Sequence, residues 1–352
     1  MDVLEAKQML SGRLLSAAAD RGVIRFRTLS IAAAALSAGQ NLHAVGVGRK
    51  LVEGSLTEQP CVRFYVTQKL PESVLAADDV LPKAVDGIVT DVIEALPAFV
   101  FPNGDLPPGV PMTAATACTD NRRGRQRPVI AGTSAANFRV TAGTISCFCR
   151  STDQQDVPGS TFVLSNNHVF ADVNRASVGD GLSQPGPADG GTTADSFALL
   201  HRFVSIQLGG HAGNRVDAAI GRVLSDIPTD SQICTIGHLS GVAEAQENMT
   251  VCKHGRTTGY TEGLVFDSSV DALVGMDHND ASIVALFQNQ LRINVASPFT
   301  AFGLGGDSGS LVLDKTTRQA VGLYNAGPPG GDYGLANRIQ DVVSELRIEL
   351  LP

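Results

Sequence analysis

The chain has no apolar run as long as the roughly 20 residues that a membrane-spanning helix needs. It is also poor in positive charge: 27 lysines and arginines stand against 35 aspartates and glutamates, which gives a formal net charge of −8. An acidic chain has no general attraction to nucleic acid or to anionic lipid. The sequence therefore predicts a protein that binds neither nucleic acid nor a membrane.

Cysteine is scarce and scattered. The six cysteines show no Cys-x-x-Cys pair and no histidine spacing of the kind that holds zinc, so neither a metal nor another cofactor is expected. Cys147 and Cys149 lie two apart on a predicted strand, so both side chains face one way and cannot easily bridge each other. The others are far apart in sequence: Cys61, Cys118, Cys234 and Cys252. We expect reduced, buried thiols.

Glycine, proline and apolar residues are plentiful. With 37 glycines, 17 prolines and 43% hydrophobic residues among 352 positions, the chain can form real cores joined by many turns. Its length suggests about two domains. We expect a mainly β protein with a helical segment in residues 1–42, a small α/β domain in 43–100, a linker in 101–127 and a larger β domain in 128–352.

Residues 29–38, mostly alanine and leucine, follow Arg25 and Arg27 and loosely resemble the core of a signal peptide. The stretch lies behind acidic residues such as Asp2 and Glu5. We therefore expect it to form a helix, and we expect a cytoplasmic location.

Alternating or continuous apolar runs predict short strands. They lie at residues 44–48, 61–66, 88–93, 144–149, 161–165, 311–313 and 320–324. The runs at 144–149 and 161–165 are expected to pair. Helical spacing over 338–350 predicts a C-terminal helix. The arginines between 122 and 127 indicate a solvated linker.

The most informative motif is Gly-Leu-Gly-Gly-Asp-Ser-Gly-Ser at residues 303–310. A serine hydroxyl is a poor nucleophile unless an imidazole takes its proton and a buried carboxylate orients that imidazole. Ser308 is the candidate nucleophile. Gly306 has no Cβ, so its N–H can turn toward a developing oxyanion, as can the N–H of Ser308. The motif predicts a nucleophile and its oxyanion hole together.

His168 and Asp217 are the candidate base and orienting acid. His168 stands in Ser-Asn-Asn-His-Val at the end of a predicted strand, and Asp217 precedes Ala-Ala-Ile, which predicts burial. Asp195 and Asp180 are alternative acids, but both stand in glycine-rich loops. His254, beside a glycine-rich turn, is a minor alternative for a catalytic role.

The order His168, Asp217, Ser308 resembles that of the chymotrypsin and trypsin family. Lys-His-Gly-Arg-Thr-Thr-Gly at 253–259 and Gln-Pro-Gly-Pro-Ala-Asp-Gly-Gly at 184–191 resemble, more narrowly, a bacterial branch of trypsin-like peptidases similar to the plant Narrow Leaf peptidase. The resemblance covers the larger β domain and implies a double antiparallel β-barrel of chymotrypsin type. It also implies a serine endopeptidase that works through an acyl-enzyme intermediate.

Substrate preference follows from the same resemblance. Six positions before Ser308 stands Phe302, where trypsins carry the aspartate that attracts arginine and lysine. An apolar pocket base is therefore expected, with a small or apolar residue before the scissile bond. Asp332 is close enough in sequence to favour arginine instead. The expected pocket wall and strand partner of the substrate backbone are Asn325, Ala326 and Gly327.

Asp307 raises the question of activation. In trypsin-like zymogens the corresponding aspartate pairs with a new N-terminus made by cleavage. Val129 and Ile130 resemble such a terminus, but Pro128 disfavours cutting after Arg127. We hypothesise that no cleavage is needed there and that an internal donor satisfies Asp307.

Residues 1–100 do not resemble the family. Three roles stay open for them: an inhibitory segment, a module for a regulatory partner, or a platform for homo-oligomerisation. The expected partner of the larger domain is a protein or peptide substrate. The alternative for the whole chain is a non-catalytic binding or scaffold protein on a protease fold.

Overall fold

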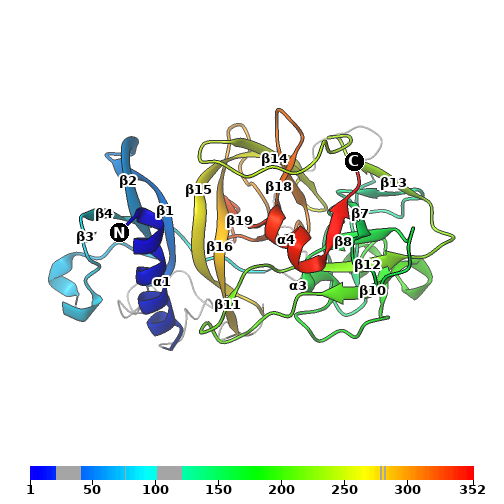
Figure 1. The fold of residues 1–352 in the computed structure, drawn as a ribbon, viewed down its shortest axis with the longest axis horizontal. Helices are drawn as coiled ribbons and strands as arrows, with labels where there is room; N and C mark the ends of the chain where they lie inside the picture. Colours follow the sequence, from blue (N-terminus) through cyan, green and yellow to red (C-terminus); the bar gives the residue numbers. More distant parts are fainter. Residues whose placement is uncertain (21–40, 76, 101–120, 278–279, 281–282) are drawn as a thin grey trace.

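β-Strands are the main regular structure of the described chain, and most of them belong to two large sheets (Figure 1). The structure is a computed structural model that describes residues 1–20, 41–75, 77–100, 121–277, 280 and 283–352. One sheet has eleven strands and the other has seven. A separate parallel pair joins β5 (Val129–Ala131) to β13 (Thr229–Ile233).

Six strands of the larger sheet close into a barrel, because β15 pairs with β16 as well as with β14. Every neighbouring pair in this ring is antiparallel. In ring order the strands are β14 (Thr250–Gly255), β15 (Gly259–Gly275), β16 (Val284–Val295), β19 (Tyr333–Arg338), β18 (Ala320–Ala326) and β17 (Leu311–Asp314). Apolar side chains fill one buried cluster of the barrel, including Val251, Val265, Ile293, Phe302, Val321 and Tyr324.

The N-terminal residues extend this sheet outward from β15. Antiparallel β1 (Leu42–Val52) pairs with the second half of β15, and β2 (Ser55–Val66), β4 (Ile88–Glu94) and β3 (Ala84–Val85) follow in that order. At the other edge, β11 (Gly213–Asn214) pairs with β16. The sheet is therefore continuous from the N-terminal strands into the barrel, with β15 between them (Figure 1).

The burial pattern along β15 changes where the strand begins to pair with β1 as well as with the barrel. Its first ten residues alternate between buried and more exposed positions, as expected of a strand with one face on a core. From Ser269 to Gly275 every residue is buried, because β1 pairs there and α1 (Val3–Asp20) packs nearby. Leu10 and Leu15 of α1 share a core cluster with Leu273.

Buried charges join the N-terminal unit to the barrel. Lys7 of α1 forms an ion pair with Asp271 of β15. Arg63 of β2 pairs with Asp267 at 2.7 Å, and all four side chains are buried. Asp267 also accepts a hydrogen bond from the Tyr65 hydroxyl. Losing one partner of such a pair leaves an uncompensated buried charge, so these contacts resist separation.

The second sheet carries antiparallel strands in the order β20 (Ile348–Leu350), β7 (Phe148–Ser151), β8 (Phe162–Ser165), β12 (Ala219–Val223), β10 (Ser196–Phe203), β9 (Gly181–Ser183) and β6 (Ala136–Asn137). Two short helices accompany the sheets, α3 (Asn167–Phe170) and α4 (Ile339–Leu346). Single 3₁₀ turns lie at Glu72–Val74, Ala77–Asp79, Pro187–Asp189 and Thr193–Asp195. An N-terminal helix followed by two β units confirms the predicted fold class.

Six of the seven predicted strands are present, and the run at 144–149 is wrong in part, because only Phe148 and Cys149 belong to β7. The two runs expected to pair do so as β7 and β8. The C-terminal prediction is wrong in part, since the helix ends at Leu346. Arg347 takes a left-handed φ of 50°, and the next residues form β20 on the edge of β7. The signal-like stretch at 29–38 lies outside the described residues, as does most of the predicted linker. The domain boundaries stay a prediction.

Two other expectations need correction. Cys234 is disulfide-bonded, so the thiols are not all reduced. The free thiols among the described residues, Cys61, Cys147, Cys149 and Cys252, are buried as expected. Arg122 is also buried rather than solvated, because its guanidinium donates to the carbonyl oxygens of Arg256 and Thr257 at 3.0 Å each. No helix of the described chain is both long and apolar enough to span a membrane.

Candidate active site

The end of one antiparallel ladder brings His168 and Asp217 together. β8 pairs with β12 so that Ser165 lies opposite Ala219. His168 follows Ser165 on α3, and Asp217 precedes Ala219. The Nδ1 atom of His168 lies 2.5 Å from Oδ2 of Asp217, and the His168 backbone N–H donates to Oδ1 at 3.1 Å. Both residues are buried, so Asp217 holds the imidazole in a fixed orientation.

Asparagines fix the backbone of Asp217. The Asn166 amide donates to the Asp217 carbonyl oxygen at 2.7 Å. Asn337, at the end of β19, accepts the Asp217 backbone N–H and donates to the Leu323 carbonyl oxygen at 3.2 Å. Since Leu323 belongs to β18 of the barrel, this contact ties the acid to the second β unit.

The Ser308 loop meets the same junction from the barrel side. The Thr144 N–H donates to the Ser308 carbonyl oxygen at 2.8 Å, and the Ser165 hydroxyl donates to the Thr144 carbonyl oxygen at 2.8 Å. Gly309, at φ of 95°, has no room for a side chain, because a Cβ would stand 2.2 Å from Oγ of Ser165. The serine loop therefore packs directly on the segment that leads to His168.

The Ser308 hydroxyl makes no hydrogen bond to the His168 imidazole in this structure. Its Oγ donates to the Asn325 carbonyl oxygen at 3.4 Å. Nε2 of His168 is buried and has no hydrogen-bond partner among the described residues. A basic nitrogen thus stands free at the junction, with the hydroxyl turned toward β18.

Two N–H groups are free to bind an anion. Gly306 has a φ of 91°, and no described residue accepts a hydrogen bond from the N–H of Gly306 or of Ser308. The Thr257 hydroxyl donates to the Gly305 carbonyl oxygen at 2.6 Å. Because the C=O and N–H of one trans peptide point opposite ways, this contact directs the Gly306 N–H away from Thr257.

The neighbouring peptide is held in the same manner. Ser310 donates to the Asp307 carbonyl oxygen through its hydroxyl at 2.5 Å and through its N–H at 2.9 Å. The Ser308 N–H belongs to that peptide and therefore points the other way. The Ser310 side chain therefore helps to fix the direction of the Ser308 N–H.

Asp307 is satisfied by internal donors, which confirms that expectation. Its Oδ2 accepts from Nζ of Lys253 at 3.3 Å, the Thr258 hydroxyl at 2.7 Å and the Leu304 N–H at 3.0 Å. Its Oδ1 accepts from the N–H groups of Thr257 and Thr258. Burial favours a raised pKa, but the Lys253 ammonium and these hydrogen bonds hold the pKa of Asp307 below its ordinary value. The carboxylate stays ionised.

A second buried ion pair supports the oxyanion loop. Arg256 reaches Asp189 with two contacts, Nη2 to Oδ1 at 2.6 Å and Nε to Oδ2 at 2.7 Å. The Ser134 hydroxyl also donates to Asp189, at 2.6 Å. A Cβ on Gly306 would stand 3.1 Å from Cδ of Arg256. The pair therefore packs against Gly306 while its charges satisfy each other.

The four predicted substrate-binding residues differ in their surroundings. Asn325 is buried beside Ser308 through its carbonyl oxygen. Ala326 is buried in the core cluster that contains Val100. Gly327 exchanges two backbone hydrogen bonds with Phe99. Phe302 is fully buried in the barrel core, with its ring against Tyr324 at a centroid distance of 6.0 Å.

Tyr324 fills the space where a side chain pocket was expected. A Cβ on Gly303 would stand 2.5 Å from Cζ of Tyr324, and one on Gly327 would stand 2.9 Å from its hydroxyl oxygen. The ring therefore lies between the residues before and after the nucleophile loop.

The alternative residues lie away from His168. Asp195 accepts from the Thr192 N–H and hydroxyl, and Asp180 accepts from the Ser177 N–H. Nδ1 of His254 donates to the Gly132 carbonyl oxygen at 3.0 Å, and burial lowers the pKa of His254 to about 4. None of the three has a hydrogen bond to the His168 side chain among the described residues.

Sequence reasoning missed Lys253, Arg256, Asp189 and Thr257 as parts of the site. All four stand in the two segments on which the narrower resemblance rests. That clustering was the available signal, but their partners are set by folding. No group of three or more acidic, cysteine or histidine side chains in the described chain is placed to hold a metal ion.

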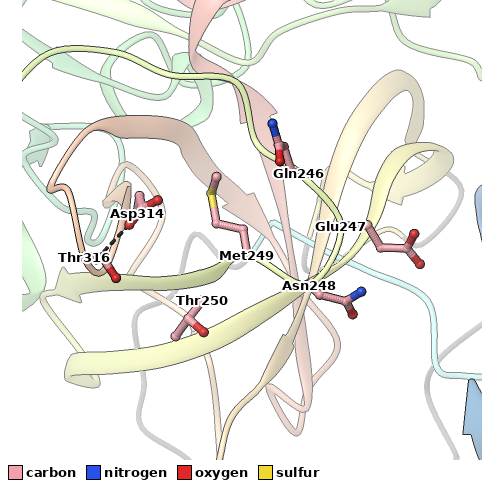
Figure 2. Close-up of a pocket in the computed structure, with 7 residues that line it drawn as sticks. All are labelled: Gln246, Glu247, Asn248, Met249, Thr250, Asp314 and Thr316. Carbon is pink, nitrogen blue, oxygen red and sulfur yellow. Dashed lines mark hydrogen bonds between the residues drawn. The ribbon is translucent and has the colours of Figure 1, made fainter.

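A hollow of about 310 Å³ lies elsewhere, where residues 246–250 meet the turn after β17 (Figure 2). Its lining is Gln246, Glu247, Asn248, Met249, Thr250, Asp314 and Thr316. The Thr316 N–H donates to Asp314 at 2.7 Å. None of the predicted catalytic residues lines this hollow, so it is not part of the site.

No protein-family model matches the chain, and no curated protein matches it in sequence. Solved structures similar to it include Thermobifida fusca protease A, with 18% identity, 63% of this chain and 98% of that chain covered, and a TM-score of 0.44. A glutamic acid-specific serine protease has 16% identity, 63% and 100% coverage, and a TM-score of 0.46. Nocardiopsis protease has 16% identity, 64% and 99% coverage, and a TM-score of 0.45. Identities this low leave activity and substrate to be argued from the site.

Proposed function

We propose that the protein is a serine endopeptidase with His168, Asp217 and Ser308 as its catalytic residues. One observation carries the proposal: a buried Asp217 carboxylate holds Nδ1 of His168 at 2.5 Å while Nε2 is left free at the junction with the Ser308 loop. This is the arrangement that a general base needs, because the carboxylate fixes the tautomer and stabilises the imidazolium. The free N–H groups of Gly306 and Ser308 supply the oxyanion hole.

The chemistry proceeds in two halves. Ser308 Oγ attacks the carbonyl carbon of the scissile peptide while His168 Nε2 takes its proton. The Gly306 and Ser308 N–H groups donate to the oxyanion, and His168 then gives its proton to the leaving amine. Water repeats the sequence on the acyl-enzyme and releases the acid. The first step needs rotation of Oγ from Asn325 toward Nε2, which a change between staggered rotamers supplies.

The Lys253 contact supports activity without cleavage near Val129. Its ammonium already lies 3.3 Å from the Asp307 carboxylate, the position that a new N-terminus takes in trypsin-like zymogens. N-terminal sequencing of labelled, active protein is expected to find residues upstream of Val129. Active protein that begins only at Val129 or Ile130 would refute this part of the proposal.

Tyr324 supports a small residue before the scissile bond. Its ring occupies the space between Gly303 and Gly327, next to the carbonyl oxygen that Ser308 contacts. The preferred substrates are therefore peptides or proteins with alanine, glycine or a similarly small residue at that position. We further propose a relation to the branch similar to the Narrow Leaf peptidase, because its two motifs supply Lys253 and the Arg256–Asp189 pair. A cytoplasmic location stays a proposal that the Cys234 disulfide does not favour.

Labelling by a fluorophosphonate tests the proposal. The reagent is expected to modify Ser308 in the full chain, and Ser308→Ala is expected to abolish labelling and to lower kcat on a peptide by about 10⁶. Ser177→Ala, at an exposed serine, is the matched control and should change neither. Turnover by Ser308→Ala close to that of the unmodified chain would refute the nucleophile assignment.

A non-catalytic binding protein is the second candidate, and the position of the Ser308 hydroxyl favours it. That hydroxyl contacts Asn325 instead of His168. If the contact is the permanent state, no labelling will occur in the full chain under any condition. Labelling of the unmodified chain excludes this candidate.

A further inference from the structure

The backbone beside the proposed nucleophile is already paired with a strand of the same chain. The Phe99 N–H donates to the Gly327 carbonyl oxygen at 3.0 Å, and the Gly327 N–H donates to the Phe99 carbonyl oxygen at 3.2 Å. The pairing is antiparallel. Both backbone groups of Gly327 are therefore used by Phe99.

The Phe99–Gly327 pair lies close to Ser308, at the end of β18. Asn325, whose carbonyl oxygen the Ser308 hydroxyl contacts at 3.4 Å, stands two residues before Gly327. In extended backbone, residues two apart present their hydrogen-bonding groups to the same edge. An antiparallel strand paired at Gly327 therefore points its C-terminal side toward Asn325 and Ser308.

The residues of a peptide substrate that precede the scissile bond must run in the same direction as this antiparallel strand. The reacting carbonyl of the substrate belongs at Ser308, and the residues that precede it extend away along the edge of Asn325 and Gly327. The residue two before the reacting one then lies opposite Gly327. That is the place and the direction of Phe99.

We propose that residues 98–100 occupy the substrate-strand site of this chain and thereby inhibit the hydrolysis of extended peptides. The proposal rests on the serine endopeptidase proposed above and describes its regulation. Its consequence is that an extended substrate must displace Phe99, whereas a substrate with one residue before the scissile bond need not.

The segment is fixed from both sides. Opposite Gly327, the Val100 N–H donates to the Gly275 carbonyl oxygen at 2.9 Å, and the Gly275 N–H donates to the Ala98 carbonyl oxygen at 3.1 Å. A Cβ on Gly275 would stand 2.3 Å from Cδ1 of Phe99. The glycine therefore makes room for the Phe99 ring at the end of β15.

The N-terminal unit holds the start of the segment. The His43 ring donates to the Ala95 carbonyl oxygen at 2.8 Å, and the Ala95 N–H donates to Val66 at the end of β2 at 2.9 Å. From the barrel side, the Tyr333 hydroxyl donates to the Leu96 carbonyl oxygen at 2.6 Å. Since buried ion pairs bind that unit to β15, its docking keeps Phe99 in place.

Two variants release the segment by different means. Phe99→Pro removes the N–H that Gly327 accepts, and Gly275→Ala places a methyl group against the Phe99 ring. Val178→Pro is the control for proline, because Val178 is exposed, lies outside the segment and donates no hydrogen bond to the described residues. Gly12→Ala is the control for added volume, since nothing lies within 4 Å of its Cβ position.

The readout compares acetyl-tetraalanine p-nitroanilide with acetyl-alanine p-nitrophenyl ester in the full chain. Both release variants should raise kcat/KM on the tetrapeptide by about 10-fold, the effect of removing a competitor held by two backbone hydrogen bonds. Hydrolysis of the ester and fluorophosphonate labelling of Ser308 should stay within 2-fold of the unmodified chain. The two controls should change neither substrate.

Hydrogen exchange tests the proposal on the unmodified chain, so the result does not depend on whether a variant folds. A tetrapeptide boronic acid should make the Phe99 amide exchange at least about 10-fold faster, because it takes the Gly327 edge. An acetyl-alanine boronic acid should leave that amide protected.

The outcomes separate the two proposals. Labelling of Ser308 together with unchanged tetrapeptide hydrolysis in folded release variants, or a Phe99 amide that stays protected with the tetrapeptide boronic acid bound, overturns the inference alone. An equal rise on both substrates also overturns it, because the segment would then act on the catalytic residues. Absence of labelling and of ester hydrolysis in every protein overturns both.

Discussion

At the scale of single residues, hydroxyl groups set the direction of the peptides that face the proposed oxyanion. Thr144 donates to the Gly306 carbonyl oxygen at 2.8 Å, and Thr257 donates to that of Gly305 at 2.6 Å. Arg256 links the two threonines, since its N–H donates to Thr144 and its guanidinium to Thr257. A flipped Gly305 peptide would point a carbonyl oxygen at the oxyanion instead of an N–H.

Thr257→Val is expected to lower kcat by about 10- to 100-fold, part of the roughly 3 kcal/mol that one oxyanion donor contributes. KM should change little, because the donor acts on the transition state. Steady-state kinetics on a peptide anilide measure the two constants. Thr257→Ser, which keeps the hydroxyl, should restore most of the rate, and equal losses in both variants would contradict this role.

Tyr324 gives a second expectation at this scale. Tyr324→Val opens the space between Gly303 and Gly327 and should raise kcat/KM for phenylalanine relative to alanine before the scissile bond, on the order of 10-fold. Tyr324→Phe keeps the ring and should leave the ratio unchanged. Paired substrates that differ only at this position measure the ratio. The same preference in all three proteins would show that the pocket lies elsewhere.

At the scale of elements, the docking of the N-terminal hairpin on β15 depends on charge as well as on apolar packing. The Arg63 guanidinium donates to Asp267 and to the carbonyl oxygens of Arg49 and Phe266. Burial raises the pKa of Tyr65, so its hydroxyl remains a donor to Asp267. Both carboxylate oxygens of Asp267 therefore accept hydrogen bonds from side chains of β2.

Arg63→Met is expected to lower the free energy of unfolding by about 3–5 kcal/mol, because it leaves Asp267 buried without its ion-pair partner. Urea unfolding of the full chain measures the change. Arg13→Met, at an exposed position of α1, is the control and should change stability by less than about 0.5 kcal/mol. A similar small loss in both variants would show that the pair does not hold the hairpin.

Local sequence patterns predicted features that depend on neighbouring residues, and they failed for features that depend on distant partners. His168, Asp217 and Ser308 could be proposed from the sequence because local patterns mark them: a strand end, an apolar run after an acid, and a glycine-rich turn. Their catalytic roles stay a prediction. Lys253 and Phe99 could not, because their partners lie far away in sequence and are brought near by strand pairing. The C-terminal helix was overextended since period alone does not show that β7 offers an edge to Ile348.

At the scale of the whole molecule, two buried histidines make stability depend on pH. Burial lowers the pKa of His43 to about 4 despite its hydrogen bond to Ala95, and the nearby Arg292 guanidinium acts in the same direction. Burial also lowers the pKa of His254 to about 4. Both rings stay neutral in the folded chain at neutral pH.

Between pH 6.5 and pH 4 the unfolded chain binds more protons at these rings than the folded chain does, so stability falls as the pH falls. Each histidine is expected to contribute a loss of about 3 kcal/mol across this window and none above it. Urea unfolding at several pH values measures the slope. His43→Gln keeps a donor for Ala95 and should reduce the loss by about one histidine's share, whereas His238→Gln, at an exposed position, should not.

One strand, β15, connects the loop around Asp307 to the segment around Phe99 through a single stretch of backbone. Its first residue follows Thr258, a ligand of the Asp307 carboxylate, and its last residue receives the Phe99 ring. At about 3.3 Å per residue, its 17 residues span on the order of 56 Å. A force applied to the N-terminal hairpin would be transmitted through the backbone of β15 to the turn that orders the anion-binding loop.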